Sequence, residues 1–392
     1  MKFQSKAVHS GDRKRTGAPI GVTTPIHLSS SYIYDDIADL DRVFGKELAG
    51  PSYSRYGNPT TGALEELVAD LEGGAGALAC STGMTALQVA LNVALMDRRR
   101  VVLAARLLYG ATLGMLTKLV EPSGVEIVWA DFDDPADVEA AIAEHRPGAI
   151  LMETIANPLL RVPALDSIAA LARAAEIPLI VDNTFATPMM VRPLEHGASF
   201  VVHSLTKYLS GHGDVLGGII ITNAEFLGPL RDYSRILGPI LGPFESYLAM
   251  RGTKTFPLRF ERQCSNAVRL AAWLAAQPAV QRVYFPGDPA HPDAANIARL
   301  FPEGLYGAMV AFEVRDAARE DIFRIMNNLR MVVPATSLGD VHTMVLYPAM
   351  ASHRDLAPRH RARLGIHDNL LRLSVGIESV EDICADLAQA LA

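Results

Sequence analysis

The chain has 392 residues, of which 49% are hydrophobic and 20% are charged, a balance typical of soluble globular proteins. At roughly 150 residues per domain, this length predicts two to three domains with large buried cores. The formal net charge of −7 argues against a general nucleic-acid binder, because such proteins carry a basic excess. The three cysteines, Cys80, Cys264 and Cys384, fit a reducing, cytoplasmic compartment and no disulfide framework.

Two segments bear on targeting and on membranes. Residues 1–17 lack the apolar stretch of a secretory signal peptide. Residues 73–96 carry no charge and are long enough to span a bilayer, but Ser81, Thr82 and Gly83 divide the run. A short buried strand followed by a buried helix explains this segment better than a membrane span. We therefore expect a cytoplasmic protein without a membrane partner.

Residues 1–58 show little regular periodicity and predict an extended N-terminal arm with a short helix at 35–42. From residue 59 onward, helical stretches alternate with apolar runs of strand length. Seven such runs occur, at 77–80, 101–105, 125–130, 148–153, 177–183, 199–204 and 217–222. Because these runs are apolar throughout and most are separated by helices such as 135–144 and 166–175, they indicate a mostly parallel sheet covered on both faces.

The pattern changes after the seventh run. A long helix is predicted over 260–277, followed by two further apolar runs and a final helix over 380–391. We therefore expect an α/β protein with a large three-layer domain at 59–252 and a smaller α+β domain at 253–392. The chain contains no internal repeat and no low-complexity segment.

Residues 81–84, with the sequence Ser-Thr-Gly-Met, lie where the first predicted strand ends and a helix begins. Free backbone N–H groups and the positive end of the helix dipole favour a bound phosphate at such a position. A merely tight turn explains the same pattern equally well. The loop by itself therefore leaves both alternatives open.

Two charged residues follow apolar runs further along the chain. Asp182 ends the run IPLIVD, where a carboxylate needs a partner such as a helix N-terminus or a protonated ligand nitrogen. Lys207 follows the run 199–204 in a loop rich in hydroxyl groups and glycine, where desolvation would lower its pKa and make the amine nucleophilic. The ordinary alternatives are a capping aspartate and a solvated lysine. The carboxyl ends of parallel strands, however, form the ligand crevice of such sheets.

A phosphate site, a strand-end aspartate and a loop lysine together match the requirements of pyridoxal 5'-phosphate. The lysine would form a Schiff base with the cofactor aldehyde. The aspartate would keep the pyridine nitrogen protonated, so that the ring withdraws electrons. The helix that begins near Gly83 would take the phosphate. The combination is more specific than any of its members.

Eight motifs support this interpretation. They are YSRYGNPT (53–60), STGMTA (81–86), ETIANP (153–158), VDNTFATP (181–188), HSLTKYLSGHGD (203–214), MRGTKT (250–255), SLGD (337–340) and LRLSVGIE (371–378). In composition and order they resemble the motifs of the pyridoxal-phosphate-dependent Cys/Met-metabolism (trans-sulfuration) enzymes, and the resemblance covers nearly the whole chain. It implies the aspartate-aminotransferase-like fold, which is fold type I of the pyridoxal-phosphate-dependent enzymes.

The resemblance also implies roles for single residues. Lys207 would be the Schiff-base lysine, Asp182 the partner of the pyridine nitrogen, and Tyr109 the group that stacks on the ring and serves as acid and base at the leaving group. The others would hold the phosphate (Ser204, Thr206, Gly83 and Met84), reach the phosphate of the neighbouring subunit (Tyr53 and Arg55) or bind the substrate (Asn157, Ser337 and Arg372, the last through the α-carboxylate).

The arm 1–58 would thus complete the site of a neighbouring subunit. The resemblance implies a dimer with shared active sites and a tetramer of two such dimers. No HExxH or CxxC pattern occurs, so we expect no metal site.

The expected reaction is γ-elimination on a sulfur-containing amino acid, as in methionine γ-lyase, giving 2-oxobutanoate, ammonia and a thiol. Capture of the intermediate by a thiol would instead give γ-replacement, as in cystathionine γ-synthase or an O-acylhomoserine sulfhydrylase. Thr336 stands where cystathionine-handling members tend to carry an acidic residue, which disfavours the further alternative, a cystathionine γ-lyase. Ala111 replaces a cysteine that is common in methionine γ-lyases. The presence of Lys207 and Tyr109 argues against a non-enzymatic protein with a vestigial site.

Overall fold

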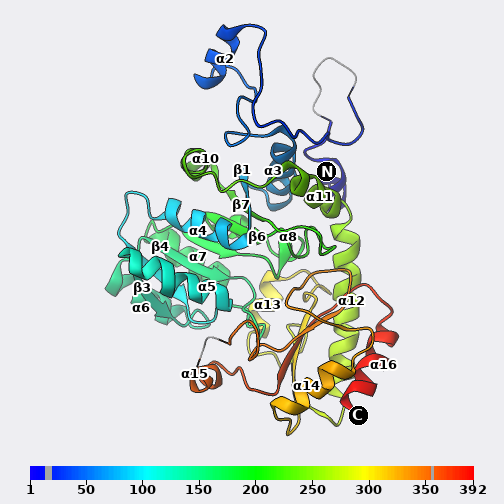
Figure 1. Cartoon of the computed structure of the whole chain (residues 1–392). Coiled ribbons are helices and arrows are strands. Elements are labelled where there is room, and N and C mark those ends of the chain that lie inside the picture. Colours follow the sequence, from blue (N-terminus) through cyan, green and yellow to red (C-terminus); the bar gives the residue numbers. More distant parts are fainter. Residues whose placement is uncertain (14–19, 355–356) are drawn as a thin grey trace.

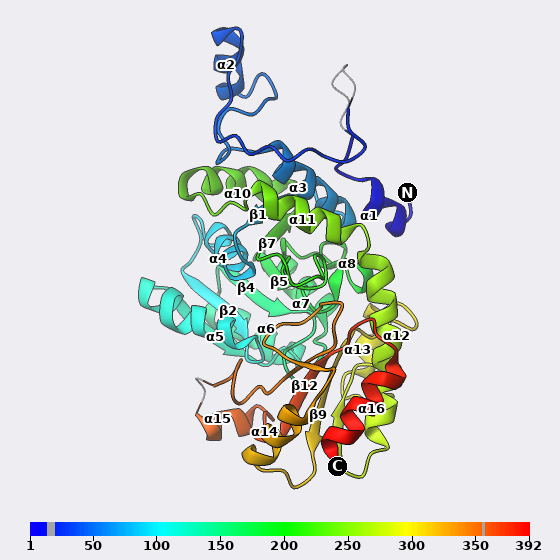
Figure 2. The ribbon, with the colours of Figure 1, turned by 45° about the vertical axis from the view of Figure 1, so that its right-hand side comes forward.

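The computed structural model describes residues 1–13, 20–354 and 357–392. Its strands form a seven-stranded sheet and a five-stranded sheet, and helices surround both (Figure 1). Figure 2 shows the larger sheet in the middle of the molecule and the smaller sheet beside the C-terminal helices. This α/β architecture agrees with the fold class expected from the sequence.

The larger sheet has the strand order β1-β7-β6-β5-β4-β2-β3. Its strands are β1 (Gly76–Cys80), β2 (Val101–Ala105), β3 (Glu126–Ala130), β4 (Ala149–Glu153), β5 (Leu179–Asp182), β6 (Phe200–Ser204) and β7 (Gly218–Thr222). Each coincides with one of the predicted apolar runs. The strands from β6 to β3 are parallel to their neighbours, whereas β7 is antiparallel to both β1 and β6. The prediction of a mostly parallel sheet is confirmed.

Every residue of β1, β2, β4 and β7 is buried, which shows that helices cover the larger sheet on both faces. The helices of this part are α3 (Pro59–Glu72), α4 (Gly83–Ala94), α5 (Gly110–Met115), α6 (Pro135–His145), α7 (Leu165–Ala174), α8 (Thr187–Met190), α9 (Pro193–His196), α10 (Ala224–Leu237) and α11 (Pro243–Thr253). A π-helical turn at Leu116–Val120 and a 3₁₀ turn at Glu121–Ser123 continue α5. Side-chain caps stabilise the N-terminal ends of several of these helices. At the start of α3, the side chain of Asn58 accepts from the N–H groups of Thr60 and Thr61.

The smaller sheet has the order β10-β11-β12-β9-β8. Its elements are α12 (Phe256–Ala275), β8 (Val280–Tyr284), α13 (Ala294–Leu300), β9 (Met309–Val314), α14 (Arg319–Asn328), β10 (Val333–Pro334), β11 (Met344–Leu346), α15 (Pro358–Arg363), β12 (Leu370–Ser374) and α16 (Val380–Leu391). The helices α12, α14 and α16 bury their apolar sides with this sheet in a second hydrophobic core. The division of the chain into 1–58, 59–252 and 253–392 stays a prediction, which the separation of the two sheets along the sequence supports.

The N-terminal arm has two different parts. Helix α1 (Phe3–His9) is anchored to the body, because Ala7 is buried and Lys6 pairs with Asp70 at 2.8 Å. Helix α2 (Ile37–Phe44), close to the predicted helix at 35–42, projects away from the body (Figures 1 and 2).

Within the described part of the chain, no helix has the length and apolar character needed to cross a bilayer. The uncharged segment 73–96 folds as β1 and α4, as expected from its interruption at 81–83.

Candidate active site

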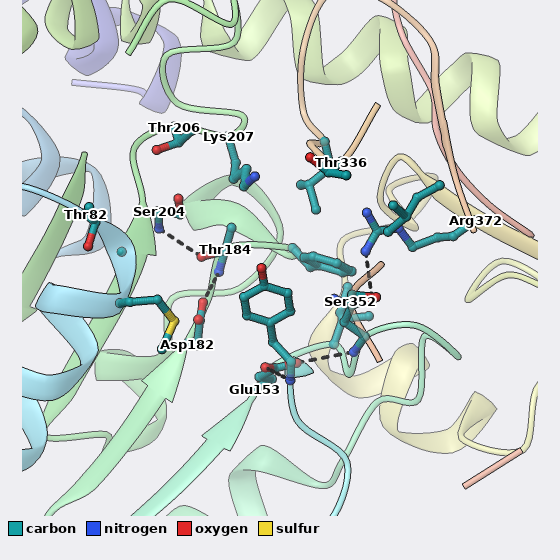
Figure 3. A pocket seen from close by; sticks show the side chains of 18 of the residues that line it. Thr82, Glu153, Asp182, Thr184, Ser204, Thr206, Lys207, Thr336, Ser352 and Arg372 are labelled. Atoms are coloured by element: carbon teal, nitrogen blue, oxygen red, sulfur yellow. Dashed lines mark hydrogen bonds between the residues drawn. The ribbon is translucent and has the colours of Figure 1, made fainter. Parts of the chain in front are cut away.

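A cavity of about 480 Å³ lies at the carboxyl ends of the parallel strands β4, β5 and β6. This is the edge at which ligands bind in open α/β sheets. On the opposite side, the C-terminal part closes the cavity with Thr336, Leu338, Leu346, Ala351, Ser352 and Arg372 (Figure 3). Nine of the predicted site residues line it: Gly83, Met84, Tyr109, Asn157, Asp182, Ser204, Thr206, Lys207 and Arg372.

One end of the cavity is formed by the start of α4. Thr82 caps this helix, because its hydroxyl accepts from the N–H of Thr85 at 3.0 Å. The N–H groups of Gly83 and Met84 lie in the first turn, where a helix offers them no acceptor. A Cβ at position 83 would lie 3.0 Å from Cβ of Ser204, so glycine permits the helix start to approach β6 closely. This end therefore presents free N–H donors and the positive end of a helix dipole.

Asp182 is the last residue of β5, and its carboxylate accepts from the N–H of Thr184 at 3.0 Å. The hydroxyl of Thr184 in turn accepts from the N–H of Ser204 at 3.0 Å, which ties β5 to β6. Burial raises the pKa of the Asp182 carboxyl above its ordinary value. A partly buried carboxylate at the wall of a cavity, bonded only by Thr184 among the described residues, is well placed to bind a cationic or N–H group inside the cavity.

Lys207 lies in the loop after β6, and its Nζ donates to Oγ of Ser337 at 3.0 Å. The buried side chain of Arg259 fixes this loop by donating to the carbonyl oxygens of Tyr208 and Leu209 at 3.0 and 3.2 Å. Burial and the charge of Arg372 lower the pKa of the Lys207 amine to about 8. The amine is therefore nearer to its neutral, nucleophilic form at physiological pH than an ordinary lysine.

Arg372 comes from β12, and it is only 2% exposed. Its Nη1 donates to Oδ1 of Asn157 at 2.7 Å, whereas its Nε has no partner among the described residues. Burial lowers the pKa of this guanidinium to about 10. A buried cation with an unused donor at the wall of a cavity is the arrangement expected for binding an anionic group.

Three predicted residues lie outside this lining. Ser337 touches the site only through its bond to Lys207. Arg55 lies with Tyr53 on the arm, and its guanidinium carbon is 5.5 Å from the Tyr53 ring centroid. Neither of these two residues lines the cavity of its own chain. Their expected role in a neighbouring subunit stays a prediction.

The cavity also contains residues that the sequence analysis did not single out. Glu153, the last residue of β4, lines its floor beside Asp182 (Figure 3). Its signal was available, because the run 148–153 ends in a carboxylate, and Asp182 stands one residue before the end of the run 177–183. Phe185 lies with its ring centroid 5.9 Å from the guanidinium carbon of Arg372, a contact across the two sheets that no local pattern reveals.

The chain was compared with known proteins. Residues 4–392 match the family model for Cys/Met metabolism PLP-dependent enzymes. The chain is 39% identical to the L-methionine gamma-lyase of Fusobacterium nucleatum subsp. polymorphum, over 98% of this chain and 96% of that protein. It is 36% identical to the O-succinylhomoserine sulfhydrylase of Pseudomonas aeruginosa, over 100% and 95%. A crystal structure of cystathionine gamma synthase from Xanthomonas oryzae pv. oryzae superposes with a TM-score of 0.92 at 35% identity, over 100% and 98%.

The chain belongs to this family. It is therefore a pyridoxal-phosphate-dependent enzyme of sulfur amino-acid metabolism with the fold of type I, and its relatives include both lyases and transferases.

The cavity fits pyridoxal phosphate on its own geometry. It offers a half-buried lysine amine, a recessed carboxylate at the end of β5 and free N–H groups at the start of α4. These three features lie on different elements that meet in one cavity (Figure 3). They match the aldehyde, the ring nitrogen and the phosphate of the cofactor in chemical type.

Proposed function

We propose that the enzyme is a γ-lyase, which releases 2-oxobutanoate, ammonia and a thiol from methionine or a similar uncharged thioether amino acid. The proposal rests on the uncharged side chains that line one wall of the cavity. Its charged lining residues are Glu153, Asp182, Lys207 and Arg372. Beyond them, the segment 336–346 contributes uncharged side chains.

That wall suits an apolar tail. Thr336, Leu338 and Leu346 line it together with Ile155 and Leu216. Cystathionine carries a second amino acid group at its far end, and a wall of this kind offers its charges no partner. A methylthio group, in contrast, gains from burial against leucine and isoleucine.

The substrate carboxylate is assigned to Arg372. Its guanidinium can hold a carboxylate with two parallel N–H groups, of which Nε is unused. Asn157 supports this arginine from the loop after β4. The two residues would fix the Cα of the substrate relative to Lys207.

The cofactor is assigned to the opposite end of the cavity. The Asp182 carboxylate would accept a hydrogen bond from the protonated ring nitrogen. The N–H groups of Gly83 and Met84 would bind the phosphate together with Ser204 and Thr206. When bound, pyridoxal phosphate supplies an electron-withdrawing ring that acidifies the protons next to the substrate amino group. Lys207 would bind the cofactor covalently in the resting enzyme.

Proton transfer is assigned to Lys207 and Tyr109. The Lys207 amine would take a proton from Cα of the substrate and return one to the product, a role that suits an amine whose pKa burial and Arg372 lower to about 8. Tyr109 is 38% exposed and lines the cavity, where its hydroxyl would protonate the departing sulfur.

A homodimer with shared sites is part of this proposal, and so is the tetramer of two such dimers. The arm leaves large apolar side chains in solvent, including Ile33 at 97% and Ile37 at 76% exposure. Burial of such side chains favours association. Tyr53 and Arg55 lie on the same arm, where they would reach the cavity of a partner subunit.

The proposal also places the enzyme in the cytoplasm, because its three unpaired cysteines fit a reducing compartment.

γ-Replacement is the second candidate, and one observation favours it. Position 111, where methionine γ-lyases commonly carry a cysteine, holds an exposed alanine in α5 that does not line the cavity. A thiol acceptor and an activated homoserine would then replace methionine as substrates.

The deciding experiment measures 2-oxobutanoate formed by cofactor-saturated enzyme from L-methionine without added thiol. We expect steady turnover. No product from methionine, together with product from O-succinyl-L-homoserine and a thiol, would establish γ-replacement instead.

A further inference from the structure

Glu153 connects the two ends of the site that handle substrate. Its Oε1 accepts from the backbone N–H of Tyr109 at 2.6 Å, and its Oε2 accepts from the backbone N–H of Asn157 at 3.3 Å. Asn157 in turn accepts from Nη1 of Arg372 at 2.7 Å. One carboxylate therefore joins the residue before α5 to the loop that supports the arginine (Figure 3).

The contacts of Glu153 are costly to replace. The side chain is 7% exposed, and Asn157 is 4% exposed, so bulk water cannot satisfy these groups. Tyr109 is the residue before α5, outside the helical conformation (φ −52°, ψ 136°), and its side chain makes no capping hydrogen bond. Its N–H therefore depends on Glu153 for an acceptor.

The electrostatic setting makes a purely structural role a poor explanation. Burial raises the pKa of the Glu153 carboxyl, and the neighbouring charge of Asp182 raises it further, while the N–H groups of Tyr109 and Asn157 lower it. A glutamate that only filled space would be replaced at lower cost by an uncharged residue. Each of the two side-chain oxygens of Glu153 meets one N–H group, an arrangement that a residue with a single side-chain oxygen cannot reproduce.

We propose that Glu153 is a positioning residue for the elimination reaction: it holds the Tyr109 hydroxyl at the leaving group in register with the carboxylate site formed by Arg372 and Asn157. This inference rests on the proposed function for the role of Tyr109. It adds Glu153 to the residues that the reaction needs. It also means that the position of Tyr109 depends on the position of Asn157 and Arg372, because Glu153 is bonded to both sides.

The test is Glu153→Gln in the holoenzyme, because glutamine keeps the size but retains a single acceptor oxygen. One N–H group would then face the amide NH₂. We expect kcat/KM on methionine to fall about 10- to 100-fold, as for a buried N–H group left without an acceptor. The visible absorbance and the affinity of the bound cofactor should stay within about twofold of wild type.

A double-mutant cycle with Tyr109→Phe assigns the cause. If Glu153 acts through Tyr109, Glu153→Gln should reduce the residual rate of the Tyr109→Phe enzyme by less than about threefold. A full loss in that background would overturn the proposal. An unchanged rate for Glu153→Gln alone would do the same.

Hydrogen exchange provides a readout that does not depend on turnover. In Glu153→Gln, amides in 106–113 and 154–160 should exchange faster, while α3 keeps its protection. The matched control is Glu313→Gln, a 3% exposed strand glutamate in β9 that accepts from Tyr284 at 2.9 Å, far along the chain from the cavity. It should leave exchange in both segments and turnover unchanged.

Two further outcomes are informative. Glu153→Asp keeps the carboxyl group but is too short to reach both N–H groups, so we expect an intermediate rate. Loss of cofactor or of folding in both Glu153 variants would overturn the proposal and assign the residue to the fold. If wild type does not turn over methionine, the proposed function fails, and the same cycle is measured with O-succinyl-L-homoserine and a thiol.

Discussion

At the carboxyl ends of β4, β5 and β6, polar side chains are buried and form hydrogen bonds with one another. The arm from residue 20 to 58, in contrast, leaves large apolar side chains exposed to solvent. Arg372 and Asn157 are 2% and 4% exposed, and they are bonded to each other. Leu28 and Ile33 in the arm are 74% and 97% exposed. The difference supports the proposed dimer, in which one chain would form most of its substrate site and a second copy would cover the arm.

The largest effect is expected at the buried edge. Lys207→Ala removes the amine that would bind the cofactor, so the visible absorbance should disappear and turnover should fall on the order of 10³-fold or more. Lys254→Ala is the control, because Lys254 pairs with Asp12 of the arm. Normal absorbance and rate in Lys207→Ala would refute the site.

The arm should have a smaller effect, and only through a partner. Arg55→Ala should weaken cofactor binding about tenfold, as for one charge-assisted hydrogen bond. Arg42→Ala on the same arm, where Arg42 pairs with Asp39, should not.

Subunit mixing sharpens this prediction. The inactive Lys207→Ala variant and the Arg55→Ala variant are mixed under conditions in which subunits exchange. In each mixed dimer, one site receives Lys207 from the Arg55→Ala subunit and Arg55 from the Lys207→Ala subunit, so that site is intact. At low cofactor concentration, activity should rise above that of either variant, toward about a quarter of wild type for random pairing. No gain on mixing, although subunits exchange, would show that Arg55 does not act across subunits.

The smallest effect is a pH dependence of cofactor capture. Only the neutral Lys207 amine attacks an aldehyde, so the capture rate should rise with pH and level off above about 8. Arg372→Leu removes a positive charge that lowers this pKa, so the midpoint should move to higher pH. Stopped-flow absorbance of the cofactor-free protein measures both. A midpoint that does not move would show that Arg372 does not act electrostatically on Lys207.

The strands could be predicted because the signal is local. Strands β1, β2, β4 and β7 are buried along their whole length, and their runs are apolar throughout, whereas the edge strand β3 is only partly buried. The direction of β7 could not be predicted. The connection from β6 to β7 is a compact loop without a helix, and such a loop returns the chain antiparallel, whereas a parallel neighbour needs a crossover.

The sequence by itself determined where Asp182 and Lys207 would stand, because a strand end and its following loop are encoded by neighbouring residues. It also determined that a helix begins near Gly83, which is the start of α4. Only the tertiary structure brought Arg372 to Asn157, 215 residues away, and placed Glu153 between Asn157 and Tyr109. Those contacts depend on how two sheets pack, and packing is decided by all the buried side chains together and not by any local pattern.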